Sequence, residues 1–240
     1  MTLKAPLLQH RLINFIRENS EYSRREVMNH LINGNVLVNQ HVVNDGNYLI
    51  SDGDVVFVNG QLIQKNDFSY YKFNKPLNVI STYKDPSGRE DLSHFIKKSK
   101  LPPTLRPCGR LDRDSSGLLL FTNDGKLINR ILHPSFLIAK DYEIKLNKPL
   151  SNTHKNQLSR GFFLSDGPVS IDFKQTYSAT HFLVSIHIGR NRILRRAFEF
   201  FGYTIIGLHR LSIGPIDLLN LSFGKFEKLP VKMIKSLVHD

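Results

Sequence analysis

Residues 109–125 read GRLDRDSSGLLLFTNDG, and this stretch constrains the fold more than any other part of the chain. The apolar run from Leu118 to Phe121, bounded by polar residues, is typical of a buried strand. The Asn-Asp-Gly triplet at 123–125 predicts a turn directly after that strand. Ahead of the strand, Asp112 stands between two arginines in a loop that follows several prolines and a glycine. The stretch therefore predicts a loop that presents an ionised carboxylate beside the protein core.

Asp112 has two interpretations when only its own neighbours are considered. A carboxylate that flanking arginines keep ionised can act as a nucleophile or as a base. Alternatively, an aspartate in a turn caps the end of the strand that follows it. The residues of this stretch leave both readings open.

The chain on the carboxyl side of this stretch alternates between helices and strands. The pattern predicts a helix over 126–132, strands over 142–146 and 182–188, and a helix over 192–201 that ends at Gly202. Strands in hairpins mixed with helices favour an α+β fold over a doubly wound parallel sheet.

The amino-terminal 64 residues predict a separate, smaller α+β module. Apolar spacing predicts a short amphipathic helix over 7–16. A second helix is expected from Ser23, which is an N-cap candidate with Glu26 as its capping-box partner, to Asn33-Gly34. Two short strands, over 36–38 and 55–58, follow. The polar residues 65–69 read as a linker.

The composition indicates a partner with negative charge. The chain has 240 residues, with 33 Lys and Arg against 21 Asp and Glu, and a net charge of +12. Neutralisation of phosphates is a usual reason for such an excess, although a basic surface that favours solubility is the alternative. Residues 1–64 hold five basic and six acidic side chains, so the excess lies in the larger carboxyl-terminal part.

Several classes of protein are excluded by missing features. The sequence has no apolar run of about 18 residues for a membrane span, and residues 1–10 do not resemble a secretion signal. One cysteine cannot form an internal disulfide, which fits a reducing cytoplasm. Neither a phosphate-binding loop, a zinc-ligand spacing nor a nucleophile elbow is present. We therefore expect a cytoplasmic protein with no membrane, metal or organic cofactor.

Two further stretches contain candidate functional residues. The sequence GRNRILRR at 189–196 places four arginines around the start of a helix, namely Arg190, Arg192, Arg195 and Arg196. Guanidinium groups there suit phosphate binding or pairing with Asp112, and a solvated basic face is the alternative. Tyr142 heads the strand in KDYEI at 140–144, where an aromatic residue of the core or its rim is the simpler reading.

Taken together and in this order, the GRLD block, the KDY strand and the GRNRILRR stretch resemble the RsuA-type branch of pseudouridine synthases. The resemblance runs from about residue 70 to residue 229. Leu158-Ser159-Arg160-Gly161 and Asp166-Gly167-Pro168 are most similar to the RluB-like members, which modify large-subunit ribosomal RNA. The resemblance implies a catalytic domain over 69–236, built on a mixed, mainly antiparallel sheet with flanking helices and a central cleft.

The same resemblance implies roles for individual residues. Asp112 would be the catalytic carboxylate, and Arg195 would pair with it and keep it ionised. Tyr142 would pack against the target base and assist proton removal from the sugar. Arg110 would fill the space that the flipped uridine leaves in the RNA, and Leu208 would form an apolar wall. Arg190, Arg192 and Arg196 would bind RNA.

Residues 6–64 resemble the S-four-like RNA-binding module that precedes the catalytic domain in this branch. Its marks are Ser-Arg-Arg-Glu at 23–26 and Asn-Gly-x-Val-x-Val-Asn at 33–39. Arg24 and Arg25 at a helix start would bind RNA phosphates beside free backbone N–H groups. Pairing of these arginines with Glu21 or Glu26 is the alternative.

The resemblance predicts that the protein isomerises a uridine in ribosomal RNA or in a pre-ribosomal particle. We expect the protein to be a monomer. Large-subunit RNA is favoured, and small-subunit RNA is the alternative. Where relatives usually have Glu-Gly-Arg and Gln-Val-Arg-Arg-Met, this chain has Ile188-Gly189-Arg190 and Ile193-Leu194-Arg195-Arg196-Ala197. This departure motivates a second hypothesis, a non-catalytic RNA-binding factor for ribosome assembly.

Overall fold

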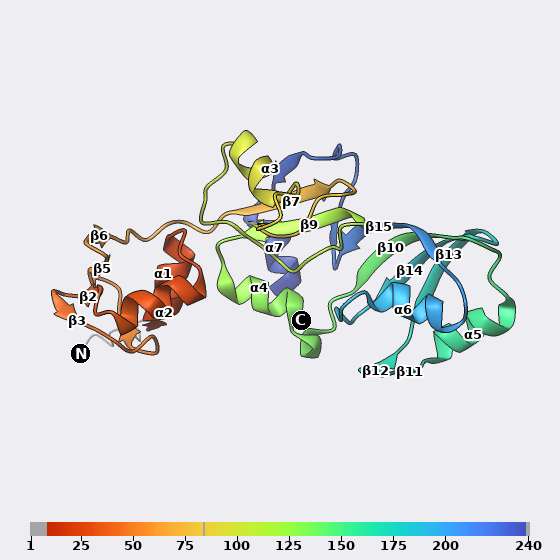
Figure 1. Ribbon diagram of the computed structural model, residues 1–240, viewed down its shortest axis with the longest axis horizontal. Helices are drawn as coiled ribbons and strands as arrows, with labels where there is room; N and C mark the ends of the chain where they lie inside the picture. Colours follow the sequence, from red (N-terminus) through yellow and green to blue (C-terminus); the bar gives the residue numbers. More distant parts are fainter. Residues whose placement is uncertain (1–8, 84, 239–240) are drawn as a thin grey trace. The chain divides into compact units, whose positions relative to one another are not determined.

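A computed structural model describes residues 9–83 and 85–238 of the protein (Figure 1). The described residues form two compact units. Unit 1 contains residues 9–69 with the short segments 102–106 and 122–125, and unit 2 contains the rest. Residues 6–8 of the expected first domain lie outside the described residues, as does the beginning of the helix expected over 7–16.

Unit 1 consists of two helices and short antiparallel strands. Its main sheet has the order β3-β2-β5-β6, and β1 pairs with β4. A core of twelve buried apolar side chains, which includes Leu12, Leu31 and Val58, joins the helices to the sheet. The element bounds are β1 His10–Arg11, α1 Leu12–Asn19, α2 Arg24–Ile32, β2 Val36–Val38, β3 His41–Val42, β4 Leu49–Ile50, β5 Val56–Val58 and β6 Gln61–Leu62.

Local sequence predicts the start of helix α2 correctly but not the start of helix α1. The Ser23 hydroxyl accepts from the Glu26 N–H and the Glu26 carboxylate accepts from the Ser23 N–H, so the predicted capping box is confirmed. Helix α1 begins later than expected, because His10 and Arg11 pair with β4 as a strand. Pairing with a distant segment is invisible to the apolar spacing that suggested a longer helix.

Unit 2 is built on a sheet that has nine strands among the described residues. The order is β13-β14-β10-β15-β9-β7-β17, with β16 on β15 and β8 on β9. The pair β15–β9 is parallel, whereas β13, β14, β10 and β15 pair antiparallel in turn. The expected mixed, mainly antiparallel sheet with flanking helices is therefore confirmed. Its bounds are β7 Tyr70–Lys75, β8 Arg106–Pro107, β9 Ser116–Thr122, β10 Lys140–Leu146, β13 Asp172–Ser178, β14 His181–Ile186, β15 Ile205–Ile213, β16 Ile216–Asp217 and β17 Phe226–Lys228.

Strand β9 lies between two layers of side chains, which explains its unbroken apolar run. Leu118 and Leu120 belong to a cluster with helices α4 and α7. Phe121 packs edge-to-face on Phe73, which also contacts Phe95 of α3. Figure 1 shows α3 on one side of β7 and β9, and α4 on the other. The bounds are α3 Leu92–Lys98, α4 Gly125–Leu132, η1 Pro134–Phe136 and α7 Val231–Val238.

Helices α5 (Asn152–Arg160) and α6 (Ile193–Phe200) complete a second cluster with β10, β14 and β15. Between α5 and β13, strands β11 (Phe162–Leu164) and β12 (Gly167–Val169) form a short hairpin. Helix α6 begins one residue later than predicted, because Arg192 adopts a left-handed conformation with φ of 45°. In the part of the chain that the structure describes, no helix is long and apolar enough to cross a membrane.

Candidate active site

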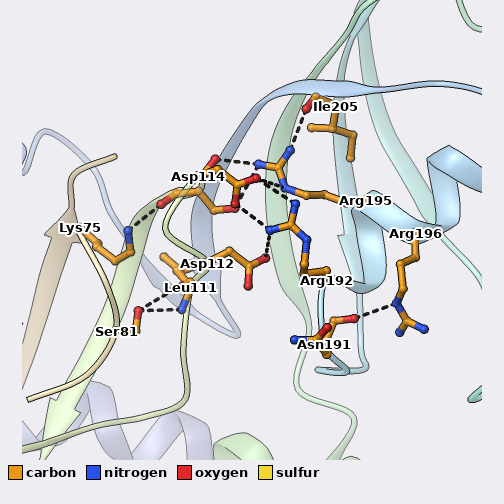
Figure 2. A network of polar contacts seen from close by, with 11 residues as sticks. Lys75, Ser81, Leu111, Asp112, Asp114, Asn191, Arg192, Arg195, Arg196 and Ile205 are labelled. Carbon is orange, nitrogen blue, oxygen red and sulfur yellow. Dashed lines mark hydrogen bonds and ion pairs between the residues drawn. The ribbon is translucent and has the colours of Figure 1, made fainter. Parts of the chain in front are cut away.

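Asp112 belongs to the loop that leads into β9, and hydrogen bonds fix this loop on both sides of Asp112. The Ser81 hydroxyl donates to the Leu111 carbonyl at 2.7 Å and accepts from the Leu111 N–H at 3.1 Å. Three residues after Asp112, the Ser115 carbonyl accepts from the Lys75 ammonium at 2.8 Å. Because both flanks of the loop are fixed, the Asp112 carboxylate is presented in a defined position rather than on a free turn (Figure 2).

Lys75 is fully buried at the end of β7, and it also donates to the Pro76 carbonyl at 2.8 Å. Burial lowers the pKa of Lys75 to about 8, although the charges of Asp112 and Asp114 act in the opposite direction. A buried cation is costly unless hydrogen bonds and opposite charges surround it. Lys75 thus fixes the loop by its two carbonyl contacts and contributes positive charge beneath the two aspartates.

Two arginines reach the same loop, namely Arg192 at the N-cap of α6 and Arg195 in its first turn. The Arg192 guanidinium lies 3.7 Å from an Asp112 carboxylate oxygen and donates two hydrogen bonds, of 3.0 and 2.9 Å, to Asp114. Arg195, which was expected to pair with Asp112, instead lies 3.2 Å from the Asp114 carboxylate. Arg192 is therefore the nearer ion-pair partner of Asp112 in this structure, whereas Asp112 acts on Arg195 through its charge.

The backbone explains the exchange of partners. Arg195 donates to the Ile205 carbonyl and to the Asp114 carbonyl, both at 2.7 Å, and these bonds hold its guanidinium between β15 and the loop. The left-handed conformation of Arg192 at the N-cap directs its side chain toward the two aspartates, as Figure 2 shows. Hydrogen bonds from Arg192, with the charges of Arg195 and Arg192, lower the pKa of Asp114.

The wall opposite Asp112 is one face of the sheet. Tyr142 pairs with Arg210 across β10 and β15, Ile144 pairs with Leu208, and Lys140 lies two residues before Tyr142. Since side chains alternate along a strand, Lys140 and Tyr142 face the same side. Tyr142, Leu208, Arg210 and Lys140 line a cavity of about 210 Å³ whose other wall includes Asp112 and Arg192; we call it the central cavity.

Two buried cations lie in the wall of the central cavity. Arg210 donates to the Leu118 carbonyl at 2.7 Å and to the Tyr142 hydroxyl at 3.3 Å, while its Nη2 is buried and has no hydrogen-bond partner in the part of the chain that the structure describes. The Lys140 ammonium donates to the Ile138 carbonyl at 3.0 Å. Burial, and next the charge of Arg210, lower the pKa of Lys140 to about 8. The central cavity thus combines one ionisable carboxylate with a cationic, partly aromatic wall.

The remaining predicted residues are divided between the central cavity and other places. Arg110 is exposed and lines the central cavity. Arg190, which also lines the central cavity, and Arg196 both bind the Asp166 carboxylate, at 3.1 and 2.7 Å, in the turn between β11 and β12. Part of their hydrogen-bonding capacity is therefore used inside the protein.

Arg24 and Arg25 lie in unit 1, at the exposed start of α2. Glu26 accepts from the Ser23 N–H through the capping box, which also lowers the pKa of Glu26. Within residues 9–83 and 85–238, no carboxylate forms an ion pair with either arginine. Pairing with Glu21 or Glu26 is thus absent, and both guanidinium groups face solvent.

The sequence reading missed Lys75, Asp114, Lys140 and Arg210 as members of the site. Lys140 lies just ahead of the strand predicted over 142–146; because β10 begins at Lys140, two residues before Tyr142, both side chains share one face. Arg210 had no usable signal, since its place depends on the pairing of β15 with β10. Among the described residues, no group of three or more His, Cys, Asp or Glu side chains is arranged to hold a metal ion.

Known proteins are similar to this chain in sequence and in fold. Residues 69–200 match the RNA pseudouridylate synthase family. The ribosomal large subunit pseudouridine synthase B of Bacillus subtilis (strain 168) is 34% identical over 223 residues, covering 90% of this chain and 90% of that protein. The dual-specificity RNA pseudouridine synthase RluF of Escherichia coli (strain K12) is 34% identical over 223 residues, covering 91% of this chain and 75% of that protein.

A solved structure supports the same assignment. A crystal structure of a pseudouridylate synthase has a TM-score of 0.68 and 26% sequence identity, and it covers 95% of this chain and 99% of that chain. The chain therefore belongs to the RNA pseudouridylate synthase family. It is a pseudouridine synthase, an enzyme that isomerises uridine to pseudouridine.

Proposed function

We propose that this enzyme isomerises a uridine in ribosomal RNA, that the large-subunit RNA contains the target, and that Asp112 is the catalytic carboxylate. The observation that carries the proposal is the position of Asp112, on a fixed loop across the central cavity from Tyr142 and Leu208. The name of the relative from Bacillus subtilis, a ribosomal large subunit pseudouridine synthase, supports ribosomal RNA as the substrate class.

The chemistry fits the residues of the central cavity. Isomerisation breaks the bond from ribose C1′ to N1 of uracil and forms a bond from C1′ to C5, after which C5 loses a proton and N1 gains one. An ionised carboxylate can attack or deprotonate the sugar, or assist the movement of the base. We assign this role to Asp112, with Arg192 as the nearer cation that favours its ionised form. Arg195 then positions the loop through Asp114.

The detached uracil needs a site of its own while it turns. Tyr142 and Leu208 offer an aromatic and an apolar surface for its ring. Negative charge develops on the base when its bond to the sugar breaks, and fixed cations in a poorly hydrated cavity stabilise such charge. We assign this stabilisation to Lys140 and Arg210, which line the central cavity beside Tyr142.

The enzyme also needs to bind the RNA backbone and to flip the target base out of its stack. Flipping a base out of a stack costs a few kcal/mol, and we propose that exposed Arg110 fills the vacated space, since a guanidinium stacks on bases and binds phosphates. We propose that unit 1 is an S-four-like RNA-binding module in which Arg24 and Arg25 bind phosphates. Their freedom from carboxylate partners among the described residues supports this assignment.

The substrate proposal is tested by incubating the full-length protein with transcribed ribosomal RNA of each subunit and mapping pseudouridine by chemical labelling and primer extension. We expect one new stop, or a few, in the large-subunit RNA. Stops confined to the small-subunit RNA would overturn the choice of subunit. No stop in either RNA would contradict ribosomal RNA as a sufficient substrate.

Replacement of Lys140 by methionine is expected to separate stability from activity. Lys140→Met removes a buried charge, so the free energy of unfolding at pH 7 should rise by about 1–3 kcal/mol. The isomerisation rate should fall by about 10- to 100-fold, because one stabilising cation is lost from the central cavity. Thermal unfolding and single-turnover rates on the same preparations measure both effects. A variant that is less stable, or as active as wild type, would show that Lys140 is purely structural.

The same lysine predicts a divergence of stability and activity at high pH. The pKa of Lys140 is about 8 in the folded protein against 10.5 ordinarily, and that of Lys75 is lowered to about 8 as well. Between pH 8 and pH 10.5 the unfolded chain binds more protons than the folded protein does. The two lysines therefore make the free energy of unfolding rise with pH in this range. Activity should fall there as Lys140 loses its charge. Rates measured from pH 7 to 10 should fall less steeply for Lys140→Arg than for wild type, and parallel profiles would count against the role.

A further inference from the structure

A second cavity, of about 420 Å³, lies beside the central cavity in unit 2. We call it the hairpin cavity, because the β11–β12 hairpin forms much of its wall. Ile188 lines both cavities, so the two are neighbours across one side chain. The reaction described above does not use the hairpin cavity. Its main lining side chains are Arg160, Phe162, Phe163, Ser170, His187 and Ile188.

The walls of the hairpin cavity match a planar ligand with negative charge. Phe163 leaves 76% of its surface exposed, a larger fraction than any other large apolar side chain among the described residues. Phe162 is held beneath by Phe200 and Phe201, each at 5.0 Å between ring centroids. None of the described residues that line this cavity carries a carboxylate, whereas Arg160 is exposed at the end of α5.

His187 adds a directed hydrogen-bonding group to the hairpin cavity. Its Nδ1 lies 2.6 Å from the Leu137 carbonyl oxygen. Since a carbonyl only accepts, Nδ1 carries the proton, and this bond leaves the second ring nitrogen, Nε2, unused. Aromatic, cationic and hydrogen-bonding groups around one cavity are the set that single-stranded nucleotides require.

The hairpin is fixed to the loop that leads into α6. Asp166 accepts from Arg190 at 3.1 Å and from Arg196 at 2.7 Å, and Arg190 also donates to the Pro168 carbonyl. The hydrogen bond from Arg196 is the main cause that lowers the pKa of Asp166, so the bridge stays charged at neutral pH. These bonds fix the hairpin to the segment that contains Arg192, and Arg192 in turn pairs with Asp112.

We propose that the hairpin cavity binds a nucleotide that neighbours the target uridine in the RNA chain, with its base stacked on Phe163 and its phosphate bound by Arg160. The inference rests on the proposed function, because it assumes an RNA substrate with its target base in the central cavity. It makes the hairpin a determinant of which uridine is modified.

The test compares Phe163→Ala with Phe163→Tyr, which keeps a stacking ring, and with Phe223→Ala. Phe223 is 60% exposed in the same unit but lines neither cavity, so it is a matched control. Dissociation constants are measured by fluorescence anisotropy on labelled, transcribed fragments of large-subunit ribosomal RNA. Because stacking on one aromatic ring is worth about 1–3 kcal/mol, Phe163→Ala should weaken binding by about 5- to 150-fold. The Tyr variant and the control should bind like wild type.

Two further measurements identify the contacts. Arg160→Gln should lower the slope of log Kd against log salt by about one, whereas Phe163→Ala should leave it unchanged. With 2-aminopurine at each position beside the modified uridine, the fluorescence change on binding should disappear at one position in Phe163→Ala only.

The outcomes separate this inference from the proposed function. If wild type forms no pseudouridine, the substrate proposal fails, and the binding constants still decide on the hairpin cavity. If wild type is active but Phe163→Ala binds RNA as wild type does, the inference is overturned while the proposed function stands.

Discussion

Asp112→Asn is expected to abolish isomerisation while RNA binding is retained. The amide has nearly the same shape but cannot act as a nucleophile or a base, so the single-turnover rate should fall by at least about 10²–10⁴-fold. Ser81 and Lys75 fix the loop by bonds to backbone carbonyls that the substitution does not touch. The measurement is pseudouridine formation on transcribed ribosomal RNA, with the dissociation constant taken from the same preparation.

Asp114→Asn is the matched control for this prediction. Asp114 lies two residues away in the same loop and receives the hydrogen bonds of Arg192. Its loss should displace Arg192 and Arg195 and reduce the rate by about 10-fold, the scale of one charge-assisted hydrogen bond. Equal losses in both variants would mean that the charge of the loop, rather than the Asp112 carboxylate, matters. Full activity in Asp112→Asn would refute its assignment.

Gly117→Ala should cause the largest loss of stability. Gly117 is paired with Arg210 where β9 runs parallel to β15, and its φ is 108°. A Cβ atom there would lie 2.2 Å from the Arg210 carbonyl oxygen and 2.5 Å from its nitrogen. Backbone atoms cannot move aside as a flexible side chain can. We expect the free energy of unfolding of unit 2 to fall by at least about 4 kcal/mol.

The control for Gly117→Ala is Gly189→Ala. Gly189 has no atom within 4 Å of its added Cβ and no left-handed φ. Circular dichroism during heating should show an unfolding temperature near that of wild type for Gly189→Ala and a large decrease, or no folded protein, for Gly117→Ala. A Gly117→Ala protein that unfolds at the wild-type temperature would contradict the close pairing of β9 with β15.

Local signals in the sequence predicted much of this architecture. The apolar run at 118–121 is a strand, Ser23 and Glu26 form a capping box, and the turn at Asn33-Gly34 ends α2. Each depends on residues within one or two turns of the chain, where propensity and capping operate. The residues named for the central cavity, Asp112, Tyr142 and Leu208, do line it together.

The features that the sequence did not predict depend on contacts between distant segments. Spacing along 189–196 could not distinguish Arg192 from Arg195 as the partner of Asp112, because the left-handed backbone at Arg192 decides it. A lysine in a sequence is normally read as exposed, yet Lys75 is fully buried by the loop that it fixes. The bridge from Asp166 to two arginines joins segments whose proximity only the folded sheet reveals.

The central claim is that Asp112 isomerises a uridine of large-subunit ribosomal RNA, and one measurement tests it most directly. Pseudouridine is mapped across ribosomal RNA from cells that lack the gene, and from the same cells given wild type or Asp112→Asn. The account predicts that a large-subunit site, or a few such sites, is lost on deletion and restored by wild type alone. An unchanged map, or restoration by Asp112→Asn, would contradict it.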